Sequence, residues 1–183
     1  TAGSPATIRP PPSSPTSVGS SVSSVDIVDG APEHAAGIAA VYAPVVADTV
    51  ISFELEPPDA EEMARRMAAS PLPWLVALEG ETVIGYGYAA PWKDRAAYRH
   101  TVETTIHVAE GHRRSGTGRA LLAALHRRLA HLDVHLAVAT IALPNPASVA
   151  IAEVAGYRPV GTIPEAGFKH GRWVDVGIWA RRI

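Results

Sequence analysis

The chain contains no cysteine, and this absence excludes several kinds of site. A disulfide framework, a thiolate metal site and a cysteine nucleophile each require a residue that the 183-residue sequence lacks. Since cysteine-free chains are compatible with a reducing compartment, we expect a cytoplasmic protein.

The sequence also lacks a long apolar run. No stretch approaches the roughly 18 residues needed to cross a bilayer. The first 24 residues contain no apolar segment of the kind found in a signal peptide. We therefore expect a soluble protein with no membrane partner.

Neither sign of charge dominates the sequence. Lys and Arg together number 16 against 18 for Asp and Glu, which gives a net charge of -2 and a pI near 6.4. Such a chain has no overall positive field with which to hold nucleic acid or acidic lipid. We expect no nucleic-acid partner, and any anion-binding site must be local.

What the sequence does contain is enough apolar residues for one core. With 47% hydrophobic residues in 183, we expect a single folded domain over residues 25–183. Residues 1–24 consist almost entirely of Pro, Ser, Gly, Ala and Thr, which cannot bury enough surface to offset ordering entropy. We expect this segment to be a disordered tail.

Hydrophobic periodicity predicts a mixed α/β domain, with an antiparallel hairpin first and a strand-helix-strand unit later. The predicted hairpin lies within 73–91, around Glu79 and Gly80. The other predicted strands cover 25–29, 102–108, 135–141, 158–163 and 173–180. The predicted helices cover 32–46, 59–70, 116–132 and 146–156.

The stretch "HVAEGHRRSGTGRALLAAL" joins a strand to a helix through arginines and glycines. The unpaired N–H groups and positive dipole at a helix N-terminus favour a phosphate, and glycine lets the backbone approach it. A P-loop would need lysine where Thr117 stands, and a Rossmann turn would need glycine where Leu121 stands. The pattern that remains is R-x-x-G-x-G. Taken by itself, the motif is equally well explained by a helix start that happens to carry Gly and Arg.

This R-x-x-G-x-G pattern resembles the coenzyme A loop of the GNAT acetyltransferase superfamily. The preceding "PWKDRAAYRHTVETTIHV" and the following "IALPNPASVAIAEVAGYRPVGTIPEAGFKHGRWVDVGIW" resemble the phosphinothricin and methionine sulfoximine N-acetyltransferases. The similarity runs from Val25 to Trp179. It implies the GNAT fold, a central mixed and mostly antiparallel sheet flanked by helices. It also implies a homodimer that uses acetyl-CoA to acetylate the α-amine of phosphinothricin, methionine sulfoximine or methionine sulfone.

The resemblance implies three contacts with acetyl-CoA. The backbone of residues 106–108 would pair with the pantetheine arm, with the Val108 N–H aimed at the thioester oxygen, and loop 113–118 would hold the pyrophosphate. Asn145 and Ser148 would line the other side of the cleft, although Asn145 between two prolines is also explained as a turn residue. The full predicted set is Ile106, His107, Val108, Arg113, Arg114, Ser115, Gly116, Thr117, Gly118, Asn145 and Ser148.

The resemblance also implies the residues that act on the amine. Glu103, on the polar face of its strand, matches the general base. Lys93 and Arg95 would hold the oxygens of the acceptor, since a guanidinium suits a carboxylate. Phe53, Trp92 and Tyr98 would wall the pocket. Taken without the resemblance, Glu103 fits a paired surface residue, the "KDR" segment a solvated loop, and the aromatics core positions.

The sequence departs from this family at one position. Many relatives carry Tyr or His where Ala152 stands, a position from which that residue could protonate the departing thiolate. Tyr157 is a nearby alternative, and it is also explained as a packed aromatic. A thiol of ordinary pKa, near 8.5, leaves without assistance, so the reaction class is retained.

Three further possibilities follow from the same residues. Acetylation of a different small amine stays open, and so does a non-catalytic acyl-CoA-binding domain, whereas Thr117 disfavours phosphoryl transfer. We expect no metal site, because His126, His131 and His135 do not share one helical face.

Overall fold

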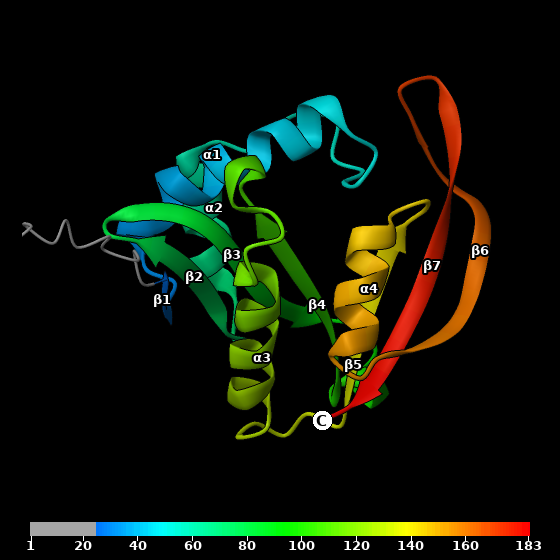
Figure 1. Ribbon diagram of the computed structural model, residues 1–183. Coiled ribbons are helices and arrows are strands. Elements are labelled where there is room, and N and C mark those ends of the chain that lie inside the picture. Colours follow the sequence, from blue (N-terminus) through cyan, green and yellow to red (C-terminus); the bar gives the residue numbers. More distant parts are fainter. Residues whose placement is uncertain (1–24) are drawn as a thin grey trace, which may run out of the picture.

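The computed structural model describes residues 25–183, so the predicted tail over 1–24 lies outside the described residues. Within that range one mixed sheet has the strand order β1-β2-β3-β4-β5-β7-β6 (Figure 1). Its strands are β1 (Val25–Asp29), β2 (Trp74–Glu79), β3 (Thr82–Pro91), β4 (Thr101–Val108), β5 (Leu136–Ala142), β6 (Arg158–Lys169) and β7 (Arg172–Arg182). Only β4 and β5 pair in parallel, so the mostly antiparallel α/β architecture is confirmed.

Helices cover both faces of this sheet (Figure 1). One face carries α1 (Ala35–Asp48) and α2 (Ala60–Ala69), and the other carries α3 (Thr117–Leu129) and α4 (Pro146–Val154). Alternation along β2 shows why: Trp74 and Val76 pack with α1, whereas Leu75 and Ala77 pack with α3. A strand with helices on both faces must be apolar throughout, as "WLVALE" largely is.

Helix α3 is anchored by one leucine stripe. Leu121, Leu125 and Leu129 recur every four residues and are fully buried. Burial of each contributes roughly 1.5–3 kcal/mol of transfer free energy. The prediction that the helix continues to Leu132 is wrong, because α3 ends at Leu129 and Leu132 lies half-exposed in the turn toward β5. The apolar spacing thus continues one leucine beyond the last core contact.

The last two strands are longer than predicted. The sequence indicated a strand over 158–163, but β6 runs to Lys169 and forms a continuous hairpin with β7. The sequence predicted too short a strand because it contains Pro159, Gly161 and Pro164, and proline and glycine usually interrupt a strand. They are tolerated because β6 is the edge of the sheet and its register shifts at 159/161 and 163/167.

Candidate active site

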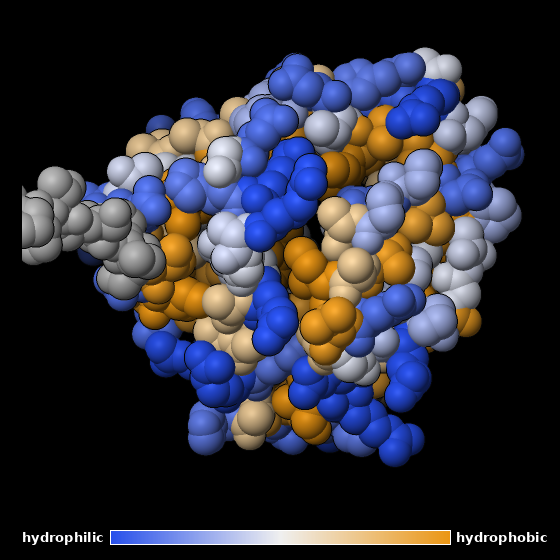
Figure 2. All heavy atoms as spheres, viewed as in Figure 1, coloured by the Kyte–Doolittle hydropathy of each residue, from blue (hydrophilic) through white to orange (hydrophobic). Residues whose placement is uncertain are grey.

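The site begins where two neighbouring strands part. β4 and β5 pair only from Thr101 to Glu103 and from Leu136 to Val138. Beyond these pairs the two strands diverge, and a cavity of about 850 Å³ is lined by residues 104–108 of β4 and 139–142 of β5. Figure 2 shows a hollow on this face between α3 and α4, with apolar side chains around it and hydrophilic ones along its rim. Backbone groups on diverging strands need other partners, so an extended polar ligand suits this gap.

One end of the cavity is the N-terminus of α3. Gly116 is the N-cap with φ of 90°, and Arg114 just before it also has a positive φ of 63°. Arg113, Arg114, Gly116 and Gly118 line the cavity, together with Arg119. The start of α3 and three arginines therefore border one space, which is an arrangement suited to a diphosphate.

Two residues of the loop 113–118 stabilise its conformation through hydrogen bonds and do not line the cavity. The Ser115 hydroxyl donates to the carbonyl of His112 at 2.6 Å, and it lies 2.7 Å from the buried Thr117 hydroxyl. Gly118 lines the cavity, and close packing explains why this residue is small. A Cβ atom there would lie 3.3 Å from Ile151 Cδ1 and 3.5 Å from Val108 Cγ2, so α3, α4 and β4 converge at this point.

Helix α4 forms a mostly apolar wall. Asn145 caps it, with its side-chain oxygen accepting from the Ser148 N–H at 3.1 Å. Asn145 and Ser148 also line the cavity, so the same two residues cap α4 and form part of the cavity wall. Ala152 lines the cavity farther along α4, where its methyl group offers no proton donor.

The other end of the cavity is rich in hydroxyls and aromatic rings. It is lined by Tyr42, Val45, Ile51, Ser52, Tyr88, Thr105 and His107. Sequence reasoning missed Tyr42, Ser52 and Tyr88 and gave His107 only a backbone role. The His107 ring packs 4.8 Å from that of Tyr42 between centroids, and burial lowers the pKa of His107 to about 4. The imidazole is therefore neutral at pH 7.

Hydrogen bonds fix the position of Tyr42. Its hydroxyl donates to Glu54 at 3.0 Å and lies 2.6 Å from the Ser52 hydroxyl, which must donate because the single tyrosine hydrogen is already used. Burial raises the pKa of Tyr42 to about 12. Arg66 donates twice to Glu54, at 2.7 and 3.0 Å, and holds the pKa of that carboxyl below its usual value. Tyr42 therefore stays protonated beside an ionised carboxylate.

Lys169 ties this end to the last strands. It is buried, and its Nζ donates to the carbonyls of Val46 at 2.6 Å and Ser52 at 2.8 Å. The loop after α1 is thus held from β6 as well as from Tyr42.

Comparisons with known proteins identify the family of this chain. Residues 43–157 match the model of the acetyltransferase (GNAT) family. The chain belongs to the GNAT acetyltransferase family. It is 39% identical over 155 residues to phosphinothricin N-acetyltransferase of Streptomyces viridochromogenes, covering 82% of this chain and 85% of the relative. It is 33% identical over 161 residues to the L-methionine sulfoximine/L-methionine sulfone acetyltransferase of Pseudomonas aeruginosa, covering 84% and 91%.

A solved structure gives the same result for the fold. The GNAT superfamily phosphinothricin acetyltransferase of Sinorhizobium meliloti, in complex with AcCoA, is 33% identical and superposes with a TM-score of 0.83. The match covers 87% of this chain and 88% of that one. The predicted GNAT fold and N-acetyltransferase class are therefore confirmed.

Glu103 lies beside the cavity of this GNAT chain rather than in its lining. It is half-buried on β4, opposite Ala90 of β3, and it shares a strand face with Thr105 and His107. Burial raises the pKa of Tyr88, and the negative charge of Glu103 adds to this effect.

The predicted acceptor-binding residues lie outside the cavity. Lys93, Arg95 and Tyr98 are exposed in the connection from β3 to β4, where Lys93 Nζ sits 4.9 Å from the ring centroid of Trp92. Phe53 packs on the edge strand instead, because its ring occupies the space where a side chain at Gly167 would begin. The structure of one chain therefore does not bring these five residues to the cavity.

The described part of the chain offers neither a membrane-spanning helix nor a metal cluster. No helix within residues 25–183 is long and apolar enough to span a membrane. No cluster of three or more His, Asp or Glu residues in the same range could hold a metal ion.

Arg114 allows charge and backbone strain to be separated. Arg114→Ala and Arg114→Gly both remove the guanidinium, so each is expected to weaken CoA binding by about tenfold. Because residue 114 has a φ of 63°, the glycine variant is expected to be more stable than the alanine variant by about 1 kcal/mol. Calorimetry with CoA and urea unfolding measure the two effects.

Arg127→Ala, at an exposed position on α3, is the matched control and should change neither quantity. Unchanged CoA affinity in both Arg114 variants would show that the guanidinium does not contact the ligand. Equal stability of the two variants would contradict the strained backbone.

Proposed function

We propose that this chain transfers the acetyl group of acetyl-CoA to the α-amine of a small amino-acid analogue, namely phosphinothricin, methionine sulfoximine or methionine sulfone. The named relatives act on these compounds, and the chain covers most of their length. The observation that carries the proposal is the cavity of about 850 Å³ between β4 and β5. It joins the arginine- and glycine-rich start of α3 to an end lined by hydroxyls and aromatic rings.

Acetyl-CoA would supply an activated acyl group as its thioester. The Arg113 to Gly118 loop would hold the diphosphate, and the free backbone of residues 106–108 would pair with the pantetheine arm, with the Val108 N–H directed at the thioester oxygen. Asn145 and Ser148 would contact the arm from α4. Glu103 would take the amine proton through water, which makes the nitrogen nucleophilic toward the thioester carbon.

We propose further that the enzyme is a cytoplasmic homodimer whose folded domain spans 25–183. Four large apolar side chains are exposed on the β6–β7 hairpin: Val160, Ile163, Phe168 and Trp173. Exposed apolar groups of this size are typical of protein interfaces. A second copy would also explain why Lys93, Arg95 and Tyr98 lie outside the cavity of one chain. Sedimentation equilibrium tests the dimer, and a monomer at micromolar concentration would overturn it.

The second candidate function is a non-catalytic acyl-CoA-binding domain. Ala152 favours it, because the α4 wall carries no acid for the leaving thiol, and so does the absence of Glu103 from the cavity lining. Acetylation of a different small amine is the other alternative.

One assay separates these functions. Thiol release from acetyl-CoA is measured with phosphinothricin, methionine sulfoximine and methionine sulfone as acceptors. Glutamate, a polyamine and a short peptide are tested separately as alternative acceptors. The proposal expects turnover with at least one of the first three and little with the others. Calorimetry with CoA is run in parallel.

Each result has one meaning. CoA binding without turnover by any amine would establish the binding-domain function. Faster turnover of the polyamine or the peptide would establish a different acceptor. No CoA binding at all would overturn the assignment of the cavity.

A further inference from the structure

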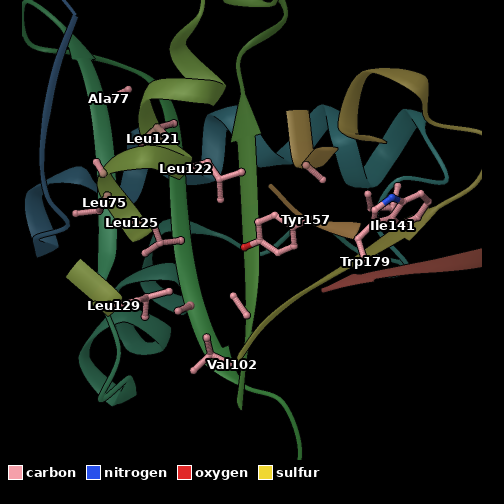
Figure 3. Close-up of a cluster of buried hydrophobic side chains, with 14 of the residues drawn as sticks. Leu75, Ala77, Val102, Leu121, Leu122, Leu125, Leu129, Ile141, Tyr157 and Trp179 are labelled. Atoms are coloured by element: carbon pink, nitrogen blue, oxygen red, sulfur yellow. The ribbon is translucent and has the colours of Figure 1, made fainter. Parts of the chain in front are cut away.

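The two faces of the sheet differ in what they bury. On the α3 face the buried cluster consists of leucines and other mostly apolar side chains (Figure 3). On the α1 face, hydrogen bonds join four polar residues into one network: Tyr42, Ser52, Glu54 and Arg66. Tyr42 and Ser52 line the cavity, whereas Glu54 and Arg66 lie behind them. They belong to the end of the cavity that carries hydroxyls and aromatic rings, here called the acceptor end.

The charge of Glu54 fixes the direction of each bond in this network. Arg66 donates twice to the Glu54 carboxylate and holds its pKa below the usual value, so this carboxylate is ionised and can only accept. The Tyr42 hydroxyl therefore donates to Glu54, which uses its single hydrogen. Across the 2.6 Å contact between the two hydroxyls, Ser52 must then donate to Tyr42.

Ser52 is left with one free acceptor position. A serine hydroxyl has one hydrogen and two lone pairs. The hydrogen goes to Tyr42, and one lone pair accepts from the Glu54 N–H at 3.1 Å. The second lone pair is what this hydroxyl offers to the cavity. Ser52 can therefore bind a group that carries a hydrogen, but it cannot donate to an oxygen.

The backbone of Ser52 is fixed as well. Lys169 is buried outside the cavity lining, and its Nζ donates to the Ser52 carbonyl at 2.8 Å and to the Val46 carbonyl at 2.6 Å. The Ser52 hydroxyl is thus held in place before any ligand arrives. A preorganised polar group of this kind binds its partner without the cost of ordering a side chain.

This hydroxyl faces the part of the cavity that is nearest to the end of β4. The ring of Tyr42, whose hydroxyl bonds to Ser52, packs 4.8 Å from the ring of His107 between centroids. His107 lies between Ile106 and Val108, whose backbone pairs with the pantetheine arm in the proposed function. A group bound at Ser52 would therefore share the acceptor end with the thioester. This step rests on the proposed function.

The chemistry of the proposed acceptors determines which of their groups suits Ser52. In methionine sulfone at neutral pH, the carboxylate and sulfone oxygens can only accept hydrogen bonds, and the amine carries the only hydrogens that can be donated. The same holds for phosphinothricin, whose carboxylate and phosphinate are both ionised. A hydroxyl that is restricted to accepting therefore binds the amine of such a molecule and rejects its oxygens.

We propose that Ser52 Oγ accepts a hydrogen bond from the amine of the acceptor molecule and so presents the nitrogen, rather than an oxygen, to the thioester. Tyr42 takes the hydrogen of Ser52, and the Arg66–Glu54 pair takes that of Tyr42, so these three are positioning residues. The hydroxyls of Tyr88 and Thr105 also line this end, but they lie on β3 and β4, outside the network.

The test compares Ser52→Ala with the matched control Ser70→Ala. The Ser70 hydroxyl likewise accepts from a backbone N–H two residues further on, that of Leu72 at 3.2 Å, but it lies outside the cavity lining. Calorimetry on the CoA-loaded protein measures the affinities of methionine sulfone and of its desamino analogue, 4-(methylsulfonyl)butanoate, which differ only in the amine. Without an acetyl group, no turnover disturbs the measurement.

The preference for methionine sulfone over the analogue should fall by about tenfold in Ser52→Ala, because one hydrogen bond to the amine is lost. It should stay unchanged in Ser70→Ala, and both variants should keep the wild-type affinity for CoA. An unchanged preference in Ser52→Ala, an equal fall in Ser70→Ala, or a wild type that has no preference would each overturn the proposal.

Tyr42→Phe separates the direction of the hydrogen bond from the integrity of the loop. It keeps the Ser52 oxygen but leaves the Ser52 hydrogen free to point into the cavity. The affinity for methionine sulfone should fall by about threefold, whereas that for the desamino analogue should not fall, because a free hydroxyl can donate to its oxygens. An equal loss of both affinities would indicate a purely structural role and would overturn the proposal.

Arg66→Met and Arg65→Met form a second matched pair. Both arginines pair with Glu62, but only Arg66 also bonds to Glu54. We expect the preference for the amine to fall by about threefold in Arg66→Met and to stay unchanged in Arg65→Met. Equal effects in the two variants would overturn the proposal. Failure of the wild type to bind CoA, or to acetylate any of the three proposed acceptors, would instead overturn the proposed function.

Discussion

Glu103→Gln is expected to lower kcat by about 10²- to 10⁴-fold while leaving KM for acetyl-CoA unchanged. Glutamine keeps the size and the hydrogen-bonding capacity of the side chain but cannot accept the amine proton. The charge of Glu103 is felt at Tyr88, which lines the acceptor end, so its loss acts where the amine would bind. Initial rates measured over a range of acetyl-CoA concentrations give kcat and KM for both enzymes.

Glu81→Gln is the control, because this glutamate is exposed in the turn between β2 and β3. A Glu103→Gln enzyme with a kcat within threefold of wild type would show that another group accepts the proton. His107 would then be the next candidate, since its neutral ring lines the same end of the cavity.

Acid is expected to destabilise the protein well before its carboxylates titrate. Burial lowers the pKa of both His107 and His126 to about 4, from an ordinary value of 6.5. Between pH 6.5 and pH 4 these two histidines are therefore protonated in the unfolded chain but largely neutral in the folded chain. The stabilising effect is complete above pH 6.5 and is lost as the pH falls from 6.5 toward 4, by roughly 2 to 3 kcal/mol for each histidine.

Urea unfolding at pH 7, 6, 5 and 4 measures this loss. The His107→Phe variant keeps an aromatic ring between Tyr42 and Tyr86. Between pH 7 and pH 4 its free energy of unfolding should fall by roughly 2 to 3 kcal/mol less than that of the wild type, which is the contribution of one histidine. His131→Asn, at an exposed position just after α3, should follow the wild type. If His107→Phe has the same pH dependence as the wild type, the His107 imidazole takes up its proton equally well in the folded and the unfolded state.

Much of the end of the cavity at the start of α3 could be predicted from the sequence because its determinants are local. The glycines and arginines of the α3 loop lie within six residues, and strand periodicity places them directly after β4. The Leu121 stripe fixed the face of α3 that packs on the sheet. The end of that helix was wrong because Leu132 keeps the spacing after the core contact has ceased.

The acceptor end could not be predicted because its residues meet only in the folded chain. Tyr42 of α1, Ser52 of the following loop and Tyr88 of β3 have no shared spacing in the sequence. The alternation of Glu103, Thr105 and His107 on β4 was the one available signal. Conversely, Lys93 and Arg95 looked suited to bind a carboxylate, but the β3–β4 connection leaves them exposed outside the cavity of one chain.

Lys169 has a consequence for the order in which the protein is built. Its two carbonyl partners, Val46 and Ser52, precede it by 123 and 117 residues. A nascent chain that has emerged from the ribosome through α4 already contains the loop before α3, but Lys169, which holds the loop after α1, has not yet been synthesised. The segment from Val46 to Ser52 is therefore expected to reach its final arrangement only after β6 has been synthesised.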